Sequence, residues 1–521
     1  MRLQLSVRTL LLASLSALHA EAQTVLPYER EDWVVAEGRI DTLVLAALDA
    51  RGIEPANPCS DEVFIRRVYI DVTGRLPQPE AVQEVLASDD PQQRALLIDS
   101  LLATEQFADY WSLKWCDLLR VKAEFPINLW PNAVQAYHHW IRDAVRENMP
   151  YDQFVRELLT SSGSNFRVPP VNFYRAIQGH EPPTIATAVA LTFMGTRLED
   201  WPEEQRSNMA AFFSRVAYKG TAEWKEEIVY LDPAAVEPLD AVLPDGTTVH
   251  IPAGEDPRAV FADWLIAPDN PWFARNVVNR IWYWLLGRGI IHEPDDIRPD
   301  NLPVNPELLA YLVQEFVDTG YDLRQIYRRI LNSRTYQQSS IPQSNDPDAE
   351  ALFAHYMVRR LDAEVLMDAL CWLSDSGEGY SSPIPEPFTW VPEYHPTVAL
   401  ADGSITSQFL ETFGRPSRDS GLESERNSNS TDGQRLYWLN SSDIQVRLER
   451  SRKLRQAMTD AKWKPAEVTR GLYLTILSRE PTEAELAAAG DYFANSGLKL
   501  YQAMVDLAWA LINTKEFLYR H

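Results

Sequence analysis

The feature that most constrains the fold of this chain is a helix-start signal followed by an apolar stripe, which recurs along most of its length. Residues 60–62 (SDE) supply a capping serine and two acidic residues ahead of Phe64 and Val68, which lie four positions apart. Residues 305–307 (NPE) and 482–485 (TEAE) precede apolar runs in the same way. This spacing places apolar side chains on one helix face, behind a residue that caps the first turn. The pattern predicts a mainly α-helical protein.

One interval departs from the helical pattern. Residues 227–231 and 249–251 are β-rich, and residues 244–246 (PDG) between them form a turn signal. We therefore predict two helical domains, residues 36–218 and 259–521, joined by a linker at 219–258 that contains a small β-hairpin. Residues 377–405 and 415–433 are rich in Gly, Pro, Ser and Asn, which predicts long loops of a kind that is often functional.

The first 22 residues have the pattern of a secretory signal peptide. Arg2 and Arg8 form a basic start, residues 10–18 are apolar, and residues 20–22 (AEA) form a small-x-small cleavage signal. The sequence predicts cleavage near Ala22 and a periplasmic or secreted protein. No later stretch has the ~18–20 continuous apolar residues of a membrane span.

The charge of the chain restricts its partners. The net charge is −25, and removal of Arg2, Arg8 and Glu21 with the signal peptide leaves −26. Such a surface repels phosphate backbones, so we expect no nucleic-acid partner. Other exported proteins and polysaccharide remain as possible partners.

The sequence lacks the common enzyme and haem-attachment motifs. The sequence contains no GxSxG, P-loop or HExxH element. Its three cysteines, Cys59, Cys116 and Cys371, form no Cys-x-x-Cys-His element, so covalent c-type haem attachment is excluded. One disulfide among them is possible in an oxidising compartment, although Cys116 and Cys371 lie beside tryptophans and are expected to be buried thiols.

Three polar groupings remain as candidates. Arg67 and Asp71 lie four positions apart and can form an ion pair on one helix. In residues 292–300, His292, Asp295 and Asp296 are candidate ligands for Ca²⁺ or another divalent metal, because this cation takes several oxygen ligands. The spacing fits no defined metal-binding loop, and helix capping with ion pairing is an alternative for the same residues.

The third grouping is residues 415–426. Arg418 and Arg426 are candidate binding groups for an anionic or sugar ligand. The candidate catalytic groups are Asp296, Arg415, Glu423 and Glu425, since paired carboxylates can serve glycosidase chemistry. This enzyme hypothesis predicts that the four side chains converge on one pocket and that at least one carboxylate has a raised pKa.

Ten ordered segments of the chain carry a resemblance to a known family. In the first half they are 61–77 (DEVFIRRVYIDVTGRLP), 139–159 (HWIRDAVRENMPYDQFVRELL), 172–176 (NFYRA) and 210–216 (AAFFSRV). In the second half they are 262–291 (ADWLIAPDNPWFARNVVNRIWYWLLGRGII), 295–301 (DDIRPDN), 330–340 (ILNSRTYQQSS), 413–418 (FGRPSR), 472–482 (LYLTILSREPT) and 510–521 (ALINTKEFLYRH). These segments resemble a family of two-domain extracytoplasmic proteins abundant in planctomycetes, known as cytochrome-associated proteins of unknown function. The resemblance implies a DUF1549-like N-terminal domain and a DUF1553-like C-terminal domain.

The chain departs from this family at two places. Relatives typically carry a Cys-x-x-Cys-His element where this sequence has residues 200–209 (DWPEEQRSNM). Many also have Cys-Glu-Cys-Glu-Arg where this chain reads LESER at 422–426. If both elements serve one haem or metal site in the relatives, these two segments should approach each other in the fold.

The resemblance and the missing cysteines together favour an exported, haem-free binding or scaffold protein without a cofactor. Two alternatives stay open. One is a carboxylate-dependent enzyme acting on polysaccharide or another exported substrate, and the other is a non-haem metal or redox protein. A shared fold does not transfer a reaction, so the residues of the site have to decide between them.

Overall fold

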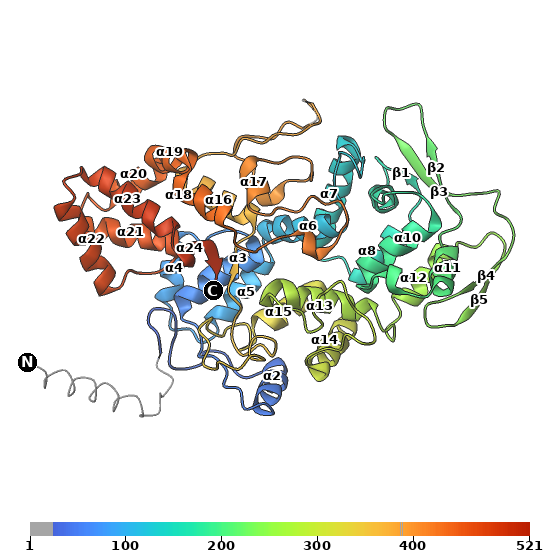
Figure 1. The fold of residues 1–521 in the computed structure, drawn as a ribbon, viewed down its shortest axis with the longest axis horizontal. Coiled ribbons are helices and arrows are strands. Elements are labelled where there is room, and N and C mark those ends of the chain that lie inside the picture. The colour runs from blue at the N-terminus through green and yellow to red at the C-terminus, as the bar shows by residue number, and fades with distance from the viewer. Residues whose placement is uncertain (1–23, 386, 388) are drawn as a thin grey trace, which may run out of the picture.

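The fold of the chain is mainly α-helical and was obtained as a computed structural model (Figure 1). The structure describes residues 24–521 except 386 and 388, so the predicted signal peptide lies outside the described residues. None of the described helices is long and apolar enough to cross a membrane. The predicted fold class is confirmed, because strands are confined to three small sheets.

The first half of the chain forms the helices that surround the centre and one end of the molecule. They are α2 (Arg39–Asp49), α3 (Asp61–Thr73), α4 (Pro79–Leu86), α5 (Gln93–Leu102), α6 (Glu105–Leu118), α7 (Pro131–Arg146), α8 (Tyr151–Thr160), η1 (Pro169–Val171), α9 (Asn172–Arg175), α10 (Pro182–Val189), η2 (Ala190–Met194), η3 (Leu198–Asp200) and α11 (Glu203–Ala211).

The second half continues as helices. They are α12 (Pro257–Leu265), α13 (Phe273–Leu286), α14 (Pro306–Asp318), α15 (Leu323–Leu331), α16 (Ala363–Ser374), η4 (Thr397–Ala399), α17 (Gln408–Thr412), η5 (Glu423–Glu425), α18 (Asp432–Asn440), α19 (Ser442–Arg450), α20 (Arg452–Asp460), α21 (Pro465–Leu477), α22 (Glu483–Asn495), α23 (Leu500–Ile512) and α24 (Lys515–Leu518).

Most of the strands fall, in sequence order, between these two sets of helices. β4 (Leu239–Val242) and β5 (Thr248–Ile251) form a hairpin around the predicted 244–246 turn, so the predicted pairing of residues 227–231 with 249–251 is wrong. β3 (Glu227–Leu231) is instead the middle strand of a separate sheet, between β1 (Gly163–Ser164) and β2 (Val216–Gly220). β6 (Arg359–Arg360) pairs with β7 (Tyr519–Arg520), which brings the last strand of the chain to the centre.

The predicted helix termini are confirmed where capping residues were recognised. The side chain of Ser60 accepts a hydrogen bond from the N–H of Val63, and α3 ends at Gly74 with a φ of 65°. Asn305 caps α14 through the N–H of Leu308. Thr482 begins α22 with a capping box, as its sequence predicts. These ends follow from neighbouring residues alone, because a cap satisfies backbone groups of its own first or last turn.

The two predicted domains share one continuous core. Figure 1 shows α3 and α6 in the middle of the molecule, between α18–α24 on one side and α8–α12 with the small sheets on the other. Buried apolar residues from both halves belong to the same cluster, among them Trp111 of α6 and Trp284 of α13, whose ring centroids are 5.5 Å apart. The halves therefore pack as one body.

Two buried arginines of α3 fasten it to the end of the chain. Arg66 donates hydrogen bonds to the carbonyl oxygens of Ile476 (2.8 Å) and Phe517 (3.2 Å). Arg67 donates to the carbonyl oxygens of Tyr336, Gln338 and His521.

The expected ion pair between Arg67 and Asp71 is therefore wrong. Asp71 instead accepts hydrogen bonds from the hydroxyls of Tyr336 (2.8 Å) and Tyr356 (3.0 Å). The two side chains lie on one helix, but packing supplies each of them with partners from distant segments.

Candidate functional site

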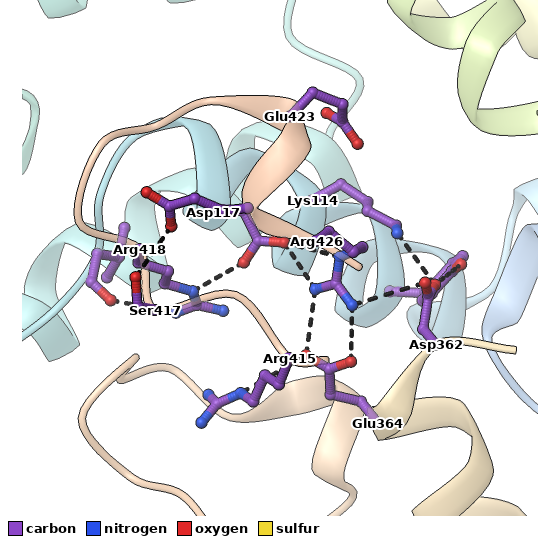
Figure 2. A network of polar contacts seen from close by, with 12 residues as sticks. Lys114, Asp117, Asp362, Glu364, Arg415, Ser417, Arg418, Glu423 and Arg426 are labelled. Atoms are coloured by element: carbon purple, nitrogen blue, oxygen red, sulfur yellow. Dashed lines mark hydrogen bonds and ion pairs between the residues drawn. The ribbon is translucent and has the colours of Figure 1, made fainter. Parts of the chain in front are cut away.

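The centre of the molecule contains a buried cluster of charged side chains, here called the central charge cluster (Figure 2). It joins α6 and α3 to the start of α16, the loop at 415–426 and the last strand. Its cations and carboxylates are equal in number. The cations are Lys114, Arg280, Arg415, Arg418, Arg426 and Arg520, and the carboxylates are Asp71, Asp117, Asp295, Asp362, Glu364 and Glu423.

Asp117, near the end of α6, holds the 415–426 loop. Its two carboxylate oxygens lie 2.9 Å from Nε of Arg418 and 2.6 Å from Nη2 of Arg426. Arg426 also reaches Glu364 of α16 at 2.7 Å. Figure 2 shows the Arg426 guanidinium between Asp117 and Glu364, so one side chain connects the two halves of the chain.

Asp362, which precedes α16, forms the second part of the cluster. Lys114 and Arg520 lie 3.0 Å and 2.9 Å from its Oδ2, and Tyr110 donates a hydrogen bond to the same oxygen. Burial opposes the ionisation of Asp362, but Lys114, Arg520 and Arg426 outweigh it and hold the pKa of this carboxyl well below its usual range.

The third part lies against α13. Oδ1 of Asp295 is 2.5 Å from Nη2 of Arg280, and Oδ2 of Asp295 accepts a hydrogen bond from the N–H of Glu423. The Glu423 carboxylate lies 4.0 Å from Arg280 and is 9% exposed. Burial raises the pKa of Glu423 although Lys114 and Arg280 favour its charged form. Glu423 therefore differs from Asp362 and Glu364, whose pKa values are lowered.

This difference predicts an unusual response to mutation at Glu423. Because its pKa is raised in the fold, the native state binds the proton more tightly than the unfolded state does. The free energy of unfolding from this group therefore falls as pH rises from its ordinary pKa of 4.5 towards the folded value. We expect Glu423→Gln to remove this pH dependence and to keep wild-type stability or more at neutral pH. Thermal unfolding of both proteins at about pH 5 and pH 7 measures it; a large loss of stability at neutral pH would contradict the expectation.

Most sequence-predicted site residues are thus engaged with one another or with backbone groups. Arg415 donates to the carbonyl oxygens of Ile405 and Asp402 and lies 3.5 Å from Glu364. Glu425 accepts hydrogen bonds from the backbone N–H groups of Asp419 and Ser420. Arg415, Arg418, Glu423 and Arg426 come together in the central charge cluster, and Glu425 shapes the loop beside it.

Asp296 and His292 lie apart from that cluster. Asp296 is 3.0 Å from Nε of Arg298, and the His292 ring faces Tyr283 with centroids 6.4 Å apart. Asp295 is the one candidate metal ligand that joins the cluster. Among residues 24–521 without 386 and 388, no group of three or more His, Cys, Asp or Glu side chains is arranged to hold a metal ion. A divalent metal at 292–300 remains a prediction from sequence.

All three cysteines lie within the described residues and are free thiols. Cys59 and Cys116 are buried, and Cys371 is partly buried. Burial raises the pKa of both Cys116 and Cys371 to about 12, so neither thiol is ionised at neutral pH.

A pocket of about 520 Å³ lies where the two halves of the chain meet, and it is called the junction pocket here. Asp200 of η3 and Leu422 both line it, so the segments 200–209 and 422–426 approach each other, as expected if the matching elements of the resembling family serve one site. The remaining lining residues are Arg120, Ile177, Gln178, Thr184, Thr187, Ala188, Leu191, Arg197, Glu199, Asp419 and Ser420.

Arg120 is the buried cation of the junction pocket, and sequence reasoning missed it. The residue is 4% exposed, and its Nε donates to the carbonyl oxygen of Ser420 at 2.9 Å. Its Nη1 is buried without a hydrogen-bond partner among the described residues. Gly421 packs on the guanidinium, since a Cβ there would lie 2.8 Å from Cζ of Arg120. No sequence motif distinguishes Arg120, because its position depends on the loop that folds over it.

A second pocket, of about 590 Å³, lies between α16 and α20 and was also missed. It contains the aromatic residues Trp372 and Tyr394 together with Asp368 and Lys453. The only sequence signal for it was the Gly- and Pro-rich stretch at 377–405, which supplies one of its walls.

Comparison with known proteins identifies the architecture. Residues 39–217 match the family model PSCyt2, described as a protein of unknown function (DUF1549), and residues 257–493 match PSD1, a protein of unknown function (DUF1553). No curated protein and no solved structure was found to match the chain. The chain therefore belongs to the proteins that combine a DUF1549 domain with a DUF1553 domain.

Proposed function

We propose that this protein is an exported, haem-free binding protein that holds a small monocarboxylate in the junction pocket. The observation that carries the proposal is the buried Arg120, which lines the pocket and has an unpartnered Nη1. Burial lowers its pKa to about 10, which leaves the guanidinium charged at neutral pH. A buried donor without a partner is costly, and we propose that a ligand carboxylate beside the guanidinium satisfies it.

The other charges of the pocket limit the ligand to a single negative charge. Glu199, Asp200 and Asp419 also line it. Asp419 is paired with Lys122 at 2.7 Å, and Arg197, the second cation of the lining, lies 3.9 Å from Glu293. A dianion such as phosphate would be repelled by these carboxylates. Thr184 and Thr187 offer hydroxyls, while Leu191 and the other apolar residues of the lining offer contact area to the body of the ligand.

The absence of haem and the export of the protein rest on the sequence. The chain has no Cys-x-x-Cys-His element, and the segment that stands in its place, residues 200–209, begins at the wall of the junction pocket. This position supports the idea that the pocket serves a different ligand here. The signal-peptide pattern of residues 1–22 supports a location outside the cytoplasm.

One observation favours the alternative of a carboxylate-dependent enzyme. Glu423 combines a raised pKa with burial, which suits a general acid. Against it, Arg415 and Glu425 are occupied by neighbouring groups, and Asp296 lies elsewhere. The four candidate side chains do not line the junction pocket together, so we favour binding over catalysis.

Calorimetric titration of the purified protein with acetate, lactate and galacturonate tests the proposal. We expect at least one of these to bind, and Arg120→Met to weaken its affinity about 10- to 100-fold, the effect of losing a charge-assisted hydrogen bond. Arg275→Met, at an exposed position of α13, is the matched control and should bind as the wild type does.

Leu191→Trp offers a second variant that narrows the pocket and leaves Arg120 in place. We expect this variant to weaken ligand binding as well. Because Arg120 is unchanged in it, weaker binding would show that the ligand occupies the pocket, and could not be explained by misfolding of an Arg120 variant. The proposal fails if none of the three carboxylates binds the wild type, or if Arg120→Met binds them with unchanged affinity.

A further inference from the structure

The second pocket, called the aromatic pocket below, is built from segments that are far apart in the sequence. Its walls come from α16, from α20, from residues 375–378 and 394–396, and from residues 75–78 after α3. The volume of about 590 Å³ is in the range of small-molecule sites. None of the residues assigned to the junction pocket contributes to it.

The charges around the aromatic pocket balance. Asp368, Asp375 and Glu378 supply three carboxylates, and Arg75, Arg452 and Lys453 supply three cations. Several of these groups already have partners: Arg452 lies 2.8 Å from Asp375, and Glu378 lies 2.6 Å from Arg447. Neither a strongly anionic nor a strongly cationic ligand is therefore favoured, and a neutral ligand rich in hydroxyl groups fits best. Hydroxyls both donate to carboxylates and accept from arginine, lysine and amide groups.

Aromatic surface provides the rest of the recognition. Nζ of Lys453 lies 3.1 Å from the centre of the Trp372 ring, so the ammonium group covers one face of the indole, and both residues line the pocket. Tyr394 lines the pocket from residues 394–396 and is 60% exposed. Trp390, nearby in the same loop, is 66% exposed. Large aromatic side chains held at a surface offer flat apolar area with a polar edge, at a small cost in conformational entropy.

The loop that forms one wall of the pocket is fixed by hydrogen bonds and close packing with the rest of the fold. Both oxygens of Asp368 accept backbone hydrogen bonds, from Thr397 (2.6 Å) and Val398 (3.1 Å). A Cβ on Gly377 would lie 1.7 Å from the carbonyl oxygen of Glu393, so the two ends of this loop pack directly together. The wall is therefore preformed, which lowers the ordering cost of binding.

We propose that the aromatic pocket is a second, independent ligand site that binds a neutral oligosaccharide against the pair formed by Trp372 and Lys453. Asp368 and Glu378 are positioned by the backbone and by Arg447, so they serve as hydrogen-bond acceptors and wall anchors rather than as a hydrolytic pair. The proposal does not depend on the junction pocket, because the two sites share no residue.

Calorimetric titration of the purified protein with cellotetraose, laminaritetraose and xylotetraose, with trigalacturonate as the charged comparison, tests this site. We expect at least one neutral tetrasaccharide to bind and trigalacturonate to bind at least about tenfold more weakly. Trp372→Ala should reduce the affinity about tenfold or more, as the loss of an aromatic contact does. Trp509→Ala, which removes a partly exposed tryptophan of α23 outside the pocket, should leave binding unchanged.

Lys453→Gln is the second variant. It removes the cation above the Trp372 ring, and because Lys453 is partly exposed we expect the variant to fold. It should also weaken oligosaccharide binding, while the affinity for monocarboxylates at the junction pocket stays constant. Binding of no neutral tetrasaccharide, unchanged binding by Trp372→Ala, or tighter binding of trigalacturonate would each overturn the proposal.

Discussion

Arg426→Ala is expected to lower the free energy of unfolding by about 3–5 kcal/mol, the cost of leaving buried partner charges uncompensated. Its guanidinium is 8% exposed and contacts Asp117 at 2.6 Å, Glu364 at 2.7 Å and Asp362 at 3.6 Å. Removing it leaves carboxylates from both halves of the chain facing each other in a buried environment. Denaturant unfolding followed by circular dichroism measures the loss.

The control for this prediction is an exposed ion pair of the same chemistry. Arg435 is 65% exposed and pairs with Asp432, which is 91% exposed. Arg435→Ala should cost less than about 1 kcal/mol, because surface pairs contribute little. If Arg426→Ala is as mild as Arg435→Ala, the central charge cluster does not hold the two halves together.

Arg67→Ala is the second substitution with a large expected effect, a loss of at least about 3 kcal/mol. The residue is 1% exposed and donates to three backbone carbonyl oxygens, those of Tyr336, Gln338 and His521. Its guanidinium also lies 3.8 Å from the centre of the Tyr356 ring. Alanine leaves these acceptors buried without a donor and removes the contact with the ring.

Arg67→Lys distinguishes the geometry of the guanidinium from its charge. Lysine keeps the charge but cannot serve several acceptors in one plane, so we expect an intermediate loss of stability. The same unfolding experiment measures it. Equal stability of Arg67→Lys and the wild type would mean that charge alone matters at this position.

The sequence predicted the local features of the fold well. The caps at Ser60, Asn305 and Thr482 and the hairpin turn at 244–246 all appear where the sequence indicates them. Each depends on interactions within a few residues, so the information is present in the local sequence.

The candidate site was predicted only in part. The sequence singled out the 415–426 loop, and Arg415, Arg418, Glu423 and Arg426 do meet in the central charge cluster. It did not indicate that Asp117 and Asp362 would form ion pairs with arginines of this loop. It also missed Arg120, since nothing near position 120 shows that the loop at 420–421 covers it.

The sequence by itself determined the helical class, the helix starts at Ser60, Asn305 and Thr482, the turn at 244–246 and the absence of a covalent haem motif. Only the tertiary structure decided which charges are paired and which groups line a pocket. Arg67 and Asp71 illustrate the reason: they are neighbours on one helix turn, yet each finds partners hundreds of residues away. Partner choice depends on which segments pack together, and packing is settled by the burial of the whole apolar core rather than by any short stretch of sequence.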